Sequence, residues 1–67
     1  MKSIYDIQQY LKQYGTYIYT TDRLVDIGLM ERELKELHEA QILPHNEYIS
    51  ALFVIKQELQ KINGKDM

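Results

Sequence analysis

The chain has 67 residues and a net charge of −2, from eight Lys and Arg against ten Asp and Glu, and it contains no Cys. Without Cys it has no disulfides or thiolate metal sites, so its stability must come from helix packing, from self-association, or from both. The longest apolar run, residues 51–55, is far too short to span a membrane, and nothing after Met1-Lys2 resembles a signal peptide. We therefore expect one small cytoplasmic domain over residues 1–67, with no membrane partner.

The first predicted helix covers residues 4–14. Ser3, with Asp6 three residues later, resembles a capping box at its start. Steps of three and four place the apolar positions on one face; these are Ile4, Ile7, Leu11 and Tyr14. Gly15 is expected to end the helix, because glycine adopts the left-handed conformation without steric cost.

Residues 16–20 are β-branched or aromatic throughout, a composition that lowers helix propensity and favours an extended backbone. No other segment alternates well enough to pair with them in a sheet. We expect an ordered extended linker in which Ile18 points inward while Tyr17 and Tyr19 share the opposite side.

The second predicted helix covers residues 22–40 and begins at a cap formed by Thr20, Thr21 or Asp22. Its apolar face repeats at three and four residues and consists of Ile27, Met30, Leu34 and Leu37, with Leu24 adjoining. Gly28 lies inside this helix at a cost of about 1 kcal/mol relative to Ala. It indicates either the close approach of another backbone or a local weakness of the helix.

The third predicted helix covers residues 45–62. It follows a tight break at residues 41–44, where Pro44 fits at or just before the first helical turn. Asn63-Gly64 is expected to close it. These three helices and the extended linker at residues 16–20 predict an all-α, three-helix bundle.

The third helix is unusually apolar. Between Tyr48 and Ile55 every residue except Ser50 is apolar, so the segment is hydrophobic around most of its circumference. Either this helix lies between the other two, or a surface including Ile49 and Phe53 meets another copy of the chain. We take Ile49 and Phe53 as the candidate self-association residues and expect a homo-oligomer.

The segment from Glu33 to Tyr48 has a Leu-x-x-Leu pair, a tight turn and then the acidic-aromatic pair Glu47-Tyr48. In this it resembles the short C-terminal (SHOCT) domain, although Gln41 stands where that motif usually has Gly. The resemblance implies only a helical hairpin used in interactions.

A second resemblance covers most of the chain. Residues 14–19 read Tyr-Gly-Thr-Tyr-Ile-Tyr, an unusual combination, and they stand between Tyr-Asp-Ile-Gln-Gln at residues 5–9 and Asp22-Arg23. With Leu29-Met30 and Glu33-Leu34 further on, the sequence resembles the YqgQ-like family of small cytosolic proteins from Gram-positive bacteria. The resemblance implies a three-helix bundle, and single-stranded nucleic-acid binding is a suggestion attached to the family.

The sequence carries no signature of catalysis or of a metal site. Ser50 is explained by a hydrogen bond back to a helix carbonyl, and the isolated glycines form no phosphate-binding loop. His38 and His45 have no carboxylate at a recognised ligand spacing, and Asp22 and Asp26 suit the positive end of a helix dipole. We predict a non-enzymatic protein with no cofactor, metal or small-molecule substrate.

Tyrosine and charge are distributed unevenly along the chain. Residues 1–23 hold five of the six tyrosines and have a charge of +1, residues 24–43 have a charge of −3, and residues 44–67 are neutral. Nucleic-acid bases stack on exposed aromatic rings while cations contact phosphates. The candidate nucleic-acid-binding residues are Lys2, Tyr5, Lys12, Tyr17, Tyr19 and Arg23.

Two functions stay open on this evidence. The first is weak binding of single-stranded nucleic acid through the N-terminal third, although a dedicated binder usually has a larger positive excess. The alternative is a protein-protein interaction adaptor or a homo-oligomeric scaffold that uses the apolar surface of the third helix or the acidic face of the second. Tyr10 and Tyr14 border the apolar face of the first predicted helix, and we expect them at the edge of the core.

Overall fold

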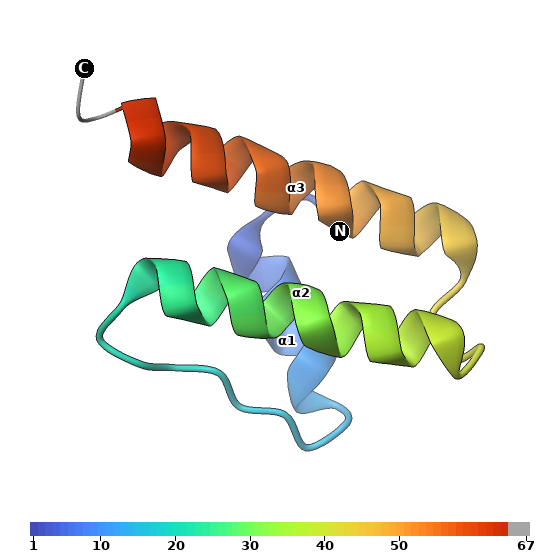
Figure 1. Ribbon diagram of the computed structural model, residues 1–67. Helices are drawn as coiled ribbons and strands as arrows, with labels where there is room; N and C mark the ends of the chain where they lie inside the picture. The colour runs from blue at the N-terminus through green and yellow to red at the C-terminus, as the bar shows by residue number, and fades with distance from the viewer. Residues whose placement is uncertain (65–67) are drawn as a thin grey trace.

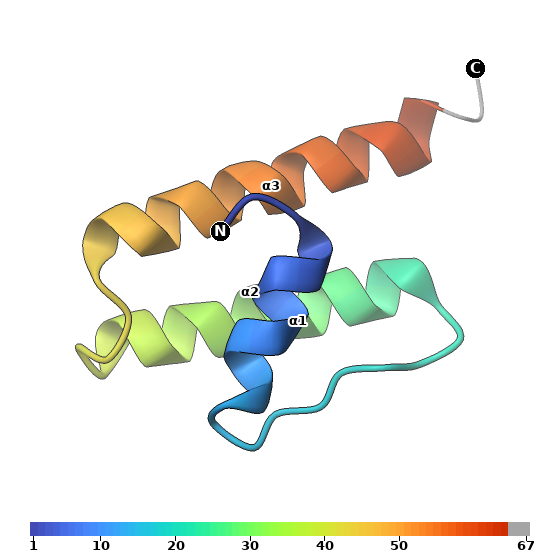
Figure 2. The same cartoon turned by 180° about the vertical axis from the view of Figure 1, so that it is seen from behind.

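Over residues 1–64 the chain folds into three helices. The computed structural model describes the backbone of residues 1–64 and the side chains of residues 1–62. The helices are α1 (Ile4–Lys12), α2 (Arg23–Glu39) and α3 (His45–Gly64). α2 and α3 form an antiparallel hairpin, and α1 runs across both of them (Figure 1 and, from behind, Figure 2). Residues 1–64 contain no strand, and the predicted all-α three-helix bundle is confirmed.

α1 begins at the predicted cap and ends earlier than predicted. The Ser3 hydroxyl accepts a hydrogen bond from the Asp6 backbone N–H, as expected for an N-cap. At the other end Gly15 has a φ of +81°, and the N–H of Thr16 reaches back to the carbonyl of Leu11 at 3.1 Å. This is a Schellman closure around a left-handed glycine. The last turn is tightened by bonds between residues three apart, so α1 ends at Lys12 instead of residue 14.

The turn between α2 and α3 repeats this closure with a different residue. The N–H of Ile42 bonds to the carbonyl of Leu37 at 3.0 Å, and Gln41 adopts a φ of +63°. Gln41 therefore takes the left-handed position for which glycine is the favoured residue. The helix, tight turn and helix implied by the SHOCT resemblance are thus present, with a strained residue in the turn.

α3 starts where Pro44 predicts, since the carbonyl of Pro44 accepts the N–H of Tyr48 at 2.9 Å. It is longer than predicted at its C-terminal end, because the helical backbone includes Asn63 and Gly64. The stop expected at these two residues is therefore wrong, and residues 65–67 lie outside the described part of the chain.

The core lies where the three helices meet. Each helix contributes one apolar stripe, and Leu43 joins it from the turn. The buried members are Ile4, Ile7, Leu11, Ile27, Met30, Leu34, Leu43, Ala51, Val54 and Ile55. Two residues predicted on these stripes are instead exposed: Tyr14, which follows the tightened end of α1, and Leu24, in the first turn of α2.

The apolar residues of α3 that lie outside its core-facing side are not covered by the other two helices. Ile49 and Phe53 are 49% and 62% exposed, whereas Ala51 and Ile55 on the opposite side are buried. The interpretation that places α3 between two covering neighbours is therefore wrong, because one face of this helix is open to solvent. The close approach of another backbone at Gly28 is wrong as well, since a Cβ added there meets no described atom within 4 Å apart from its chain neighbours and the backbone of its own helix.

The N-terminal residue, Met1, is held against α3 by a hydrogen bond and an ion pair. The Ser50 hydroxyl donates to the carbonyl of Met1 at 3.2 Å, which corrects the expectation that Ser50 bonds back to its own helix. The amino group of Met1 lies 3.4 Å from the Glu47 carboxylate. These contacts fix the segment that leads into α1 across the start of α3.

Candidate nucleic-acid interface

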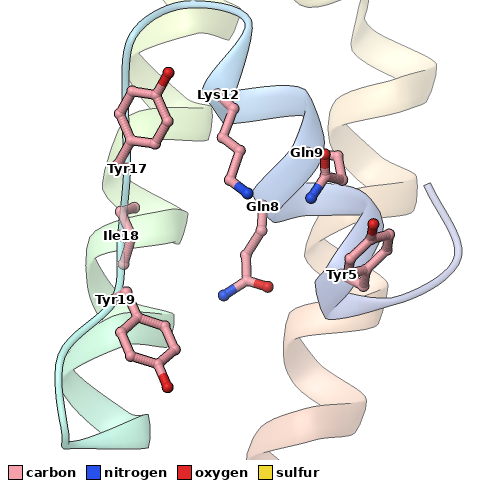
Figure 3. A pocket seen from close by; sticks show the side chains of 7 residues that line it. All are labelled: Tyr5, Gln8, Gln9, Lys12, Tyr17, Ile18 and Tyr19. Carbon is pink, nitrogen blue, oxygen red and sulfur yellow. The ribbon is translucent and has the colours of Figure 1, made fainter.

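A groove of about 410 Å³ lies between α1 and the linker at residues 16–20. Figure 3 shows the linker tyrosines on one side and Tyr5 on the other, with Gln8 and Lys12 between them. Four of the six candidate nucleic-acid-binding residues line this groove together, although they come from two separate segments. The full lining is Tyr5, Gln8, Gln9, Lys12, Tyr17, Ile18 and Tyr19.

The three tyrosines of the groove present their rings to solvent. Tyr5, Tyr17 and Tyr19 are 65%, 73% and 90% exposed. Ile18, between the two linker tyrosines, packs against the core. The predicted alternation of the linker, with Ile18 inward and its neighbours outward, is therefore confirmed. Rings this accessible offer flat apolar faces on which a nucleic-acid base can stack.

α1 directs its polar face into the groove because its opposite face is anchored in the core. Ile4, Ile7 and Leu11 are buried, so the residues on the other side of the helix turn outward. That outward side contributes the phenol of Tyr5, the Gln8 and Gln9 amides and the ammonium group of Lys12. The groove thus offers amide donors and acceptors beside its aromatic rings.

The linker is held at its far end by a buried carboxylate. Asp26 is 6% exposed, and its Oδ1 accepts the backbone N–H of Thr20 at 2.9 Å and the Thr20 hydroxyl at 2.6 Å. Asp22 caps α2 by accepting the N–H of Leu24 at 2.9 Å. Both acids therefore have structural partners, and the turn that carries the linker into α2 is fixed by side-chain hydrogen bonds.

The groove is locally cationic. Lys12 is charged, and no carboxylate is among the described residues that line it. Two candidates lie elsewhere: Lys2 is exposed outside the lining, and Arg23 forms an ion pair with Glu58 at 3.1 Å. The chain therefore gathers the aromatic part of the predicted site in one place, but it does not bring the three predicted cations together.

The two tyrosines omitted from the predicted site form a pair of their own. The hydroxyl groups of Tyr10 and Tyr14 are hydrogen-bonded at 3.5 Å, and the ring centroids lie 5.2 Å apart. Burial, followed by the interaction with Tyr14, raises the pKa of Tyr10 to about 12. Tyr10 also packs against the core, as expected for a ring at its edge, whereas the same expectation is wrong for Tyr14, which is exposed.

Comparison with known proteins assigns the chain to a family. A family model described as YqgQ-like matches residues 1–61. The chain belongs to the YqgQ-like family. It is 37% identical over 67 residues to the uncharacterized protein YqgQ of Bacillus subtilis (strain 168), an alignment that covers 98% of this chain and 94% of the relative. No solved structure matches the chain.

The YqgQ-like chain has a second, shallower groove on the open face of α3. It has a volume of about 250 Å³ and is lined by Ile49, Leu52, Phe53 and Lys56. Both candidate self-association residues therefore lie in one apolar hollow on the surface. This groove differs from the first in having a single aromatic ring and no amide groups.

The sequence predicts no site at His38 and His45, yet the two rings meet at the α2–α3 turn of this YqgQ-like chain. The Nε2 of His38 and the Nδ1 of His45 lie 3.2 Å apart, and the His38 ring stacks on Tyr48 with centroids 4.3 Å apart. The only signal in the sequence is that a tight turn separates the two histidines. It brings the end of α2 beside the start of α3.

Two features are absent from the described part of the YqgQ-like chain, a metal-binding cluster and a membrane-spanning helix. No three His, Cys, Asp or Glu side chains converge there as a metal-binding group. None of the described helices combines the length and the apolar composition needed to cross a membrane. Every buried side-chain nitrogen or oxygen in the described residues has a hydrogen-bond partner.

Proposed function

We propose that this YqgQ-like chain is a non-enzymatic cytoplasmic protein that binds single-stranded nucleic acid weakly in the groove between α1 and the linker. The observation that supports the proposal is the convergence of Tyr5, Tyr17 and Tyr19 with Lys12 around one groove of about 410 Å³. Aromatic stacking contributes about 1–3 kcal/mol per base in single-strand binders. Single strands suit this site, since bases inside a duplex have their faces covered by their neighbours.

Stacking is expected to outweigh charge in this interaction. The groove contains one lysine, and Arg23 is already paired with Glu58. For single strands, the logarithm of the binding constant falls with the logarithm of the salt concentration, with a slope of about −0.7 for each phosphate that is neutralised. One cation therefore predicts a shallow salt dependence with a slope of about −0.7. The net charge of −2 keeps general attraction to nucleic acid low.

A titration of a fluorescent single-stranded oligonucleotide tests the proposal. We expect saturable binding at low salt that weakens by roughly tenfold in Tyr17→Ala and in Tyr19→Ala, the loss of about one stacked base. Lys12→Ala should flatten the salt dependence. The matched controls are Lys35→Ala, which removes an exposed lysine from α2, and Tyr14→Ala, which removes an exposed tyrosine outside the groove.

Two results would reject nucleic-acid binding in the groove. One is the absence of binding even at low salt. The other is equal loss of affinity in Lys12→Ala and Lys35→Ala with no effect of Tyr17→Ala, because that pattern is generic charge attraction. A duplex of the same sequence serves as the comparison ligand and should bind more weakly than the single strand.

The open face of α3 supports self-association as a second candidate function. Phe53 is 62% exposed beside Ile49, and together they line an apolar groove on a chain with a small core. Sedimentation over a wide concentration range should reveal a dimer or larger oligomer, and Phe53→Glu should convert it to monomers that keep the same helix content. A wild-type chain that stays monomeric at every concentration would reject this function.

A further inference from the structure

The two histidines of the chain meet at the α2–α3 turn, and neither takes part in the proposed function. They are the only histidines in the sequence. His38 lies in the last turn of α2 and His45 is the first residue of α3. Their facing ring nitrogens, Nε2 of His38 and Nδ1 of His45, are 3.2 Å apart.

This separation suits two ligands of one metal ion. Imidazole nitrogens bind Zn²⁺ at about 2.0–2.1 Å, so two such ligands lie about 3.3 Å apart at a tetrahedral angle and about 2.9 Å apart at a right angle. The observed 3.2 Å falls between these values. The backbone thus places the two rings at the spacing of a chelating pair. The two nitrogens share a hydrogen bond, so one ring must rotate before both lone pairs point at the same ion.

The cluster also restricts the orientation of one ring. His38 is partly buried and stacks on Tyr48, with an angle of 17° between the ring planes. His45 is exposed, so its ring is the one that turns when an ion enters from solvent. A metal-ligating side chain that packing already holds in place loses less conformational freedom on binding than a freely rotating one does.

We propose that His38 and His45 form a chelating site for a borderline divalent transition-metal ion of the Zn²⁺, Ni²⁺ and Cu²⁺ class. Water occupies the remaining coordination positions, because no third His, Cys, Asp or Glu converges on the pair within the described residues. Imidazole suits these ions better than it suits Mg²⁺ or Ca²⁺, which prefer oxygen ligands. Cu²⁺ binds more tightly than Zn²⁺, following the general order of divalent metals.

Calorimetric titration of the chain with Zn²⁺ and with Cu²⁺, together with NMR of the histidine rings under added Zn²⁺, tests the site. We expect one ion per chain, and we expect the ring signals of both histidines to shift together during the Zn²⁺ titration. His38→Asn and His45→Asn should each weaken Zn²⁺ binding by at least about tenfold, since a single imidazole remains.

The controls separate this site from binding elsewhere and from loss of fold. Circular dichroism should show unchanged helix content in both Asn variants. Mg²⁺ should leave the ring signals unmoved. The proposal is overturned if the wild-type chain does not bind Zn²⁺ at millimolar concentration. It is also overturned if the single variants bind Zn²⁺ as tightly as the wild type, because the ion then lies at another site.

Discussion

Thr20 and Asp26 connect the tyrosine-bearing linker to α2 through a single carboxylate oxygen. The Oδ1 of Asp26 accepts both the backbone N–H and the hydroxyl of Thr20, and the carboxylate is almost completely buried. Tyr19 is the neighbour of Thr20 in the chain, so this pair determines where the linker tyrosines stand relative to α1. The site and the stability of the fold therefore share one set of hydrogen bonds.

Replacing Asp26 with Ala should lower both the free energy of unfolding and the affinity for an oligonucleotide. The substitution removes two hydrogen bonds to a charged group and leaves the N–H of Thr20 without its partner, which costs about 1–3 kcal/mol. Chemical denaturation measures the first effect. The control is Asp22→Ala, which removes the α2 cap at a cost of about 1 kcal/mol but leaves the Thr20 contacts to Asp26 in place. Equal oligonucleotide affinity in the two variants would contradict a role for Asp26 in positioning the linker.

Gly28 is a position where a larger residue should stabilise the chain. It lies inside α2, and apart from its chain neighbours and the backbone of its own helix a Cβ added there meets no described atom within 4 Å. Because Ala has the higher helix propensity, Gly28→Ala should raise the free energy of unfolding by about 0.5–1 kcal/mol. A thermal melt at low protein concentration measures it. Destabilisation that appears only at high concentration would contradict the open environment and indicate that another chain packs on Gly28.

Gly15 and Gln41 occupy equivalent positions at the ends of α1 and α2 and should respond in opposite directions. Both have positive φ, +81° and +63°. Gln41→Gly should stabilise the chain by about 0.5–1 kcal/mol by removing the strain of a side chain in the left-handed region. Gly15→Ala should destabilise it by about 1–2 kcal/mol for the same reason. Urea denaturation of the two variants side by side checks the pair, and effects of the same sign would refute this explanation of the turns.

Tyr10 should make the stability of the chain depend on pH at the alkaline end. Its pKa is about 12 in the folded chain and 10 in the absence of the fold. Between these pH values the unfolded chain has released the phenolic proton while the folded chain retains it. The free energy of unfolding is therefore unaffected by this group below pH 10 and falls as the pH rises from 10 to 12. Denaturation curves across this range test the effect, and Tyr10→Phe should show a smaller decrease; an identical decrease would contradict it.

The sequence predicts those parts of the fold that depend on neighbouring residues. The Ser3 cap, the Gly15 closure and the inward Ile18 follow from rules that act within one or two turns of chain, and each is confirmed. The predicted end of α1 at residue 14 is too late because bonds between residues three apart tighten the last turn, a difference that periodicity does not detect.

The parts that could not be predicted depend on contacts between distant segments. Proximity in sequence places Arg23 with the tyrosines of the predicted site, but in the fold it pairs with Glu58, 35 residues away. The groove exists because the linker runs back beside α1, and periodicity describes each segment but not how two segments pack. The His38–His45 contact likewise depends on the geometry of the turn between two helices.

NMR mapping of backbone amides during an oligonucleotide titration shows whether single-stranded nucleic acid binds in the groove between α1 and the linker. We expect the shifts to concentrate on Tyr5, Gln8, Lys12, Tyr17 and Tyr19 and to leave Ile49 and Phe53 on α3 unchanged. Shifts confined to the α3 face, or no shifts at millimolar oligonucleotide, would contradict it.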